Sequence, residues 1–136
     1  MRIWVRDTPL RAGVSEEALR SFESRYGLFL PPAFRAYLAL VDGNEDWVGG
    51  RMISFWSLAE IYEEMKTRKV LPGAVATTVP FADFLINSHV YALHIAVGTE
   101  APVVIEHPRI GLRIPCGETF EEFVDLYERD DPRLYR

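Results

Sequence analysis

Cysteine, long apolar runs and positive charge are all scarce in this chain of 136 residues. Cys116 is the only cysteine, so the chain cannot form an internal disulfide, which excludes a disulfide-stapled secreted scaffold. The longest apolar runs, at 37–41 and 101–105, are far shorter than the roughly 20 residues of a membrane span. The net charge of −5 argues against non-specific nucleic-acid binding, which requires a basic surface.

Motifs that carry chemistry are also scarce. The three histidines, at 89, 94 and 107, are not spaced as the ligands of one metal ion. The sequence has no nucleophile elbow and no glycine-rich phosphate loop. Cys116 precedes a predicted helix, where a thiol pKa can be lowered, but a small half-buried turn residue is the simpler interpretation. We therefore expect no catalytic residue, no metal and no cofactor.

The size and composition are those of one ordinary globular domain. A length of 136 residues is a common domain size, and 49% hydrophobic and 26% charged residues are ordinary globular values. We therefore predict a single domain over residues 1–136. Residues 1–7 carry charge on both sides of a short apolar stretch and lack the apolar core of a signal peptide, so we expect a cytoplasmic protein.

Four segments repeat apolar residues at helical spacing, which predicts four helices. The predicted helices cover residues 15–26, 32–41, 58–69 and 120–128. Pro32 suits the first turn of the second helix. Ser57 with Glu60, and Thr119 with Glu122, predict capping boxes at the starts of the third and fourth helices.

The segments between the helices have the alternation or the β-branched content of strands. The predicted strands cover residues 51–56, 79–86, 90–97, 102–106 and 112–114, with an edge strand at 1–5. Asn87-Ser88-His89 is turn-like and predicts a hairpin. Helices and strands do not alternate regularly, so we predict an α+β fold. Its antiparallel or mixed sheet has about five or six strands, covered on one face by about four helices.

Acidic residues and one tryptophan point to a protein partner. The second half of the chain, residues 69–136, carries ten acidic and six basic side chains, and an acidic surface selects basic partners. The polar loop that follows the second helix contains a tryptophan, a residue enriched at interaction hot spots. A solvated loop whose tryptophan packs on the core is the simpler interpretation. The acidic residues of this loop lack the ligand spacing of a calcium-binding loop. The predicted partner-binding residues are Asp42, Asn44, Glu45, Asp46 and Trp47 in this loop, and His89 in the hairpin.

The order of several short motifs matches a known family. An acidic helix at 15–23 is followed by Leu30-Pro31-Pro32, by a second helix, and by Asp42-Gly43-Asn44. This order resembles the SUKH superfamily, in the branch similar to the fungal cell-wall-assembly regulators. The segments 51–58, 79–82, 103–105 and 119–123 resemble the later elements of the family in the same order. The chain departs from the family at Asn87-Ser88-His89, where family members often carry a Gly-Asp pair.

The resemblance implies a compact α+β domain without established catalysis. Many bacterial members are thought to be immunity proteins that bind and neutralise toxins, and the fungal branch is linked to cell-wall synthesis and signalling. We therefore expect a non-catalytic immunity protein that binds a basic toxin domain, as a monomer or weak dimer. A regulatory or scaffold domain that binds a host protein is the main alternative. A small-ligand receptor, or an enzyme that uses Cys116 or the histidines, is a further alternative.

Overall fold

The computed structural model describes residues 10–44, 53–69, 76–84, 88–96, 101–107 and 109–135. The predicted edge strand at 1–5 lies outside the described residues. In chain order the elements are β1 (Leu10–Ala12), α1 (Glu16–Tyr26), α2 (Pro32–Leu40), β2 (Val41–Asn44), β3 (Ile53–Phe55), α3 (Leu58–Thr67), β4 (Ala76–Phe84), β5 (His89–Ala96), β6 (Val103–His107), β7 (Leu112–Pro115), α4 (Phe120–Arg129) and the short 3₁₀ helix η2 (Pro132–Tyr135).

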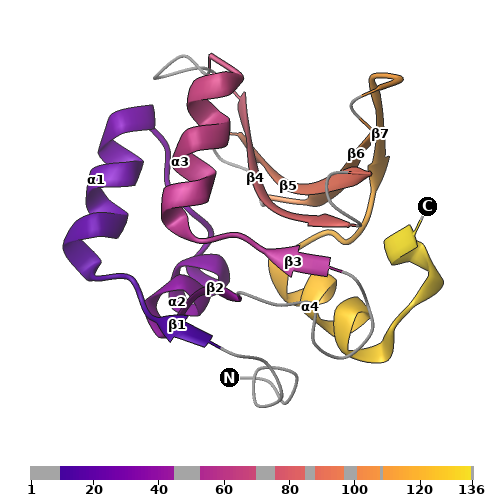
Figure 1. The fold of residues 1–136 in the computed structure, drawn as a ribbon, viewed down its shortest axis with the longest axis horizontal. Helices are drawn as coiled ribbons and strands as arrows, with labels where there is room; N and C mark the ends of the chain where they lie inside the picture. The colour runs from indigo at the N-terminus through magenta and orange to yellow at the C-terminus, as the bar shows by residue number, and fades with distance from the viewer. Residues whose placement is uncertain are drawn as a thin grey trace.

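The main sheet is a five-stranded antiparallel meander in the order β3-β4-β5-β6-β7. The predicted α+β fold is therefore confirmed. Strands β4 and β5 form the predicted hairpin and pair from Phe84 with His89 to Ala76 with Ala96. Figure 1 shows a curved sheet with α4 below it and with α1 and α3 at its left.

The core lies between the sheet and the helices. Phe55, Ala82, Tyr91 and Ile105 occupy one row across strands β3 to β6, and all four are buried. Phe123 of α4 packs against this row, with its ring centroid 5.1 Å from that of Tyr91 and 6.2 Å from that of Phe55. Each such aromatic side chain contributes about 1.5–3 kcal/mol by its burial, so α4 is fixed to the sheet mainly by apolar packing.

The helix starts follow the predicted capping chemistry, with one difference. At α3 the Ser57 hydroxyl accepts from the Glu60 N–H and the Glu60 carboxylate accepts from the Ser57 N–H, so the capping box is complete. At α4 the Thr119 hydroxyl accepts from the Glu122 N–H. The Glu122 carboxylate, however, accepts from the N–H of Glu118, one residue earlier than predicted.

One short sheet was not predicted. The second helix ends at Leu40, one residue earlier than expected, and the segment expected as helix end and loop forms strand β2, which pairs with β1. Gly43 shows how closely this segment approaches β3. Its φ is +76°, and a Cβ there would lie 2.6 Å from the carbonyl O of Phe55, so tertiary contact determines the local structure.

Candidate protein-binding surfaces

The predicted recognition loop is only partly within the described residues. Asp42 is half-buried, and its Oδ1 accepts a hydrogen bond of 2.7 Å from the N–H of Leu58, the first residue of α3. The positive end of the α3 dipole also stabilises a carboxylate at this position. Asn44 pairs with Leu10 between β2 and β1. The remaining predicted residues, Glu45, Asp46 and Trp47, lie outside the described residues.

His89 lies inside the protein, at the start of β5. It is 6% exposed, and its ring stacks on Phe84 with the centroids 4.8 Å apart. Its Nε2 is 3.1 Å from the Tyr91 hydroxyl, which donates a 2.7 Å hydrogen bond to the carbonyl of Leu134. Burial lowers the pKa of His89, and the nearby His107 lowers it further. Tyr91 therefore links the 3₁₀ helix η2 to the sheet, and His89 packs beside this hydrogen bond.

The sole thiol belongs to the same interior region. Cys116 is fully buried, and its Sγ lies 3.6 Å from the carbonyl O of Arg133, to which it donates. A buried thiol that donates its proton is the less reactive form of cysteine. Among the described residues, no three side chains of His, Cys, Asp or Glu gather closely enough to bind a metal ion. Within the same part of the chain, no helix is long and apolar enough to cross a membrane.

A mostly polar row of side chains crosses the opposite face of the sheet, and its buried carboxylate at Glu106 is paired with two arginines. The strand register aligns Ser54, Asp83, Val90, Glu106 and Arg113 across β3 to β7. Glu106 is buried, and its two oxygens lie 2.8 Å from Arg68 Nη1 and 3.3 Å from Arg113 Nε. A buried carboxylate between two guanidinium groups is typical of an internal ion pair.

The most acidic part of the chain is α4 with its flanking turns, residues 118–135, which we call the acidic segment. It carries seven acidic and two basic side chains, a net charge of −5 that equals the net charge of the whole chain. Glu118 and Glu121 are exposed. Asp131 is bound by Arg133, and that hydrogen bonding lowers the pKa of Asp131 to about 2. The acidic segment therefore presents at least the carboxylates of Glu118 and Glu121 to solvent.

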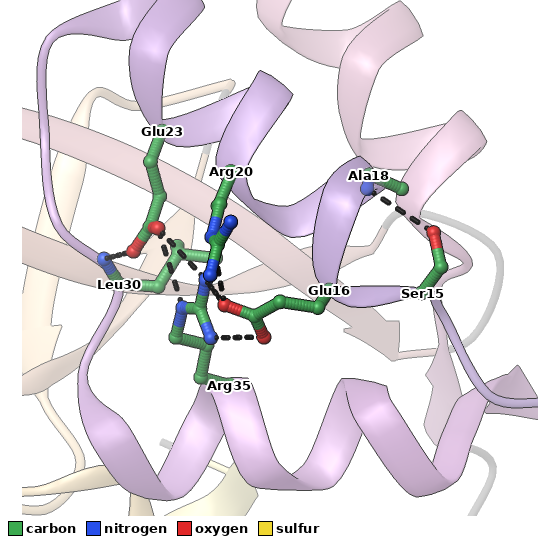
Figure 2. A network of polar contacts seen from close by, with 7 residues as sticks. All are labelled: Ser15, Glu16, Ala18, Arg20, Glu23, Leu30 and Arg35. Carbon is green, nitrogen blue, oxygen red and sulfur yellow. Dashed lines mark hydrogen bonds and ion pairs between the residues drawn. The ribbon is translucent and has the colours of Figure 1, made fainter.

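A network of ion pairs joins α1 to α2, as Figure 2 shows. Arg35 of α2 makes two 2.7 Å hydrogen bonds to the Glu16 carboxylate and lies 3.2 Å from Glu23 Oε1. The hydrogen bonds from Arg35 lower the pKa of Glu16. Glu23 Oε2 also accepts a 2.8 Å bond from the N–H of Leu30, and the Glu23 carbonyl accepts from the N–H of Leu28. The turn between α1 and α2 is therefore held on both sides of its central residue.

That central residue is Phe29, which is 85% exposed although its neighbours Leu28 and Leu30 are buried. It borders a shallow groove of about 710 Å³ beside α2, where Pro32 and Ala36 are also exposed. No motif in the sequence predicts a role for Phe29. Leu28, Phe29 and Leu30 are three consecutive apolar residues between two helices. An extended segment can bury only alternate side chains on one face, so this run indicates that at least one of the three is exposed.

The comparisons with known proteins agree with this organisation. The model of the SMI1 / KNR4 family (SUKH-1) matches residues 13–126, which extend from just before α1 into α4. This match confirms the resemblance found in the sequence. No curated protein matches the chain. The chain belongs to the SMI1 / KNR4 family (SUKH-1), a family of generally non-enzymatic immunity or regulator domains that act through protein–protein interaction.

Proposed function

We propose that this domain is an immunity protein that neutralises a basic toxin domain by binding it directly. The observation that carries the proposal is the acidic segment, whose net charge of −5 accounts for the charge of the whole chain. Family membership supports a non-catalytic protein-binding role in general. A concentrated negative charge speeds association with a basic protein and disfavours acidic competitors, which suits an inhibitor that must act quickly.

The exposed carboxylates of the acidic segment are the proposed first contacts. Glu121 lies in the first turn of α4 and Glu118 lies in the turn before it, so both are held on a packed element. Because the backbone that carries these two charges is already ordered, binding requires little further ordering of the backbone. Asn44, Glu45, Asp46 and Trp47 remain proposed partner contacts. Asp42 and His89 have internal partners, so their proposed contribution is to hold the surrounding backbone in place.

The proposal is tested by capture followed by growth rescue. Proteins bound from a lysate of the source cell are identified and expressed alone, and a toxic one is then co-expressed with this domain. Wild type is expected to restore growth, and a Glu118→Lys/Glu121→Lys variant is expected to restore it much less. A captured partner that is harmless when expressed alone would contradict the immunity role and would favour a regulatory domain.

A matched variant controls for the change in net charge. Glu17→Lys/Glu63→Lys reverses two exposed charges outside the acidic segment. Glu17 is the second residue of α1, as Glu121 is of α4, so both variants place a lysine at an unfavourable position of the helix dipole. The control is expected to restore growth like wild type. Equal loss in both variants would show that net charge alone matters, and would overturn the assigned surface.

A further inference from the structure

Helix α2 is apolar on both of its faces. Phe34, Tyr37 and Leu38 are buried in the core, whereas Ala36 and Leu40 point outward and are exposed. The one charged residue of α2, Arg35, is held by Glu16 and Glu23. A helix that is apolar all round is normally buried on all sides. The outer face of α2 therefore has the composition of a covered surface.

Large and small side chains are ordered along this outer face. We call Phe29, Pro32, Ala36, Ala39 and Leu40 the α2 surface. Its two ends carry large side chains that are 85% exposed at Phe29 and 59% exposed at Leu40, and the small Ala36 lies between them. The turn that presents Phe29 is fixed by the hydrogen bonds to Glu23, so little order must be gained on binding.

We propose that the α2 surface binds a second copy of this chain. Two α2 helices would pack antiparallel about a two-fold axis near Ala36. Phe29 of each copy would then meet Leu40 of the other and lie against the groove lined by Pro32, Ala36 and Ala39. A two-fold interface must be self-complementary, and this surface carries both a projecting ring and an apolar groove. The alanines at its centre would allow the two helices to approach closely.

Charge favours a second copy over a basic or acidic partner at this surface. The groove is bordered by Arg20, Glu23 and Arg35, and Glu16 is paired with both arginines. These two acidic and two basic side chains cancel, so two copies can meet here without repulsion although each carries a net charge of −5. A pair formed through the acidic segment would bring like charges together. The self-association is therefore separate from the proposed toxin-binding role.

The size of the surface sets the strength of the pair. An aromatic side chain buries about 150–250 Å², and a stable interface needs about 800 Å² from each partner. Phe29, Leu40 and three small residues fall short of that area. The dimer is therefore weak and concentration-dependent, with a dissociation constant in the micromolar range.

Sedimentation equilibrium over a range from low micromolar to near-millimolar protein tests the proposal. Wild type is expected to pass from monomer to dimer over this range. Phe29→Ser and Ala36→Arg alter exposed side chains that the core does not use, and each is expected to weaken dimerisation at least tenfold. Ile110→Ser, at a residue 72% exposed in the turn before β7, is the matched control and is expected to change nothing. A wild type that stays monomeric throughout would overturn the proposal.

Cross-linking tests the position of the two-fold axis. Cys116 is buried, so the wild-type chain has no accessible thiol and gives no background. Ala36→Cys is expected to form a disulfide-linked dimer under mild oxidation, because the two cysteines would face each other across the axis. Ile110→Cys, at a position that is also exposed, is expected to remain mostly monomeric. Equal cross-linking of the two variants would show random collision and would contradict the proposed axis.

Discussion

A single carboxylate, that of Glu23, links α1, the following turn and α2 through Leu30 and Arg35. We expect Glu23→Ala to lower the free energy of unfolding by about 1–3 kcal/mol, because the buried N–H of Leu30 loses its acceptor. Urea denaturation measures this loss. Glu63→Ala, which removes only an exposed ion pair with Lys66, is the control and should change stability by less than about 0.5 kcal/mol. Equal losses in the two variants would contradict the role given to Glu23.

His89 makes stability depend on pH. Burial and His107 lower its pKa in the folded protein, whereas in the unfolded chain its pKa is about 6.5. As pH falls below about 6.5, the unfolded state binds a proton that the folded state does not, so stability is lost. We expect Tm to fall between about pH 7.5 and about pH 5.5, and to fall less in His89→Gln. Identical losses in wild type and variant would exclude this contribution.

Residue roles were only partly predictable from the sequence. Asp42 in the loop and His89 in the hairpin were predicted to contact a partner. Asp42 instead accepts from Leu58 of another element, and His89 lies against Tyr91 and is buried where β4, β5 and β6 meet. Phe29 lies beside two buried leucines, and no local pattern shows which of the three faces outward. Side-chain direction is set by tertiary packing, which a single sequence does not display.

Among the elements, α3 has two independent caps at its start. Ser57 and Glu60 form the local capping box, and Asp42 reaches the same end from β2. We expect Asp42→Ala to lower the free energy of unfolding by about 1–2 kcal/mol, because the Leu58 N–H is left without its acceptor. Asp42→Asn keeps an acceptor and should cost less. Thermal or urea unfolding measures both, and a loss in neither would contradict the second cap.

The 3₁₀ helix η2 covers the sole cysteine. Leu134 is fully buried, and the Arg133 carbonyl accepts from the Cys116 thiol. We expect Leu134→Ala to raise the alkylation rate of Cys116 at least tenfold, because loss of this buried side chain loosens η2. Circular dichroism should show that the remaining fold is kept. An unchanged rate in a folded variant would show that η2 does not protect the thiol.

Elements with local signals were the predictable ones. The four helices carry apolar periodicity and a local start signal, which is a side-chain cap at α1, α3 and α4 and Pro32 in the first turn of α2. All four form close to their predicted bounds. Strands β1 and β2 were missed because they are three and four residues long and pair across about thirty residues of chain. Val41 has an extended backbone, and Gly43 has a positive φ where its backbone lies against β3.

On the scale of the whole molecule, charge and apolar surface are separated. The acidic segment accounts for the net charge of the chain, while the α2 surface is apolar and bordered by charges that cancel. The α+β meander could be predicted from the order of the elements, and the charge asymmetry from simple counting. The α2 surface could not, because it depends on which face of an apolar helix the core covers.

The rate of association with the toxin identified by capture tests the central claim most directly, namely that the acidic segment recognises a basic partner. The rate constant is measured by stopped flow at low and at high salt for wild type, for Glu118→Lys/Glu121→Lys and for Glu17→Lys/Glu63→Lys. We predict that wild type and the Glu17/Glu63 control associate rapidly at low salt and slow steeply as salt rises. The acidic-segment variant should be at least tenfold slower at low salt and nearly independent of salt. The same rate and salt dependence in all three proteins would contradict the account.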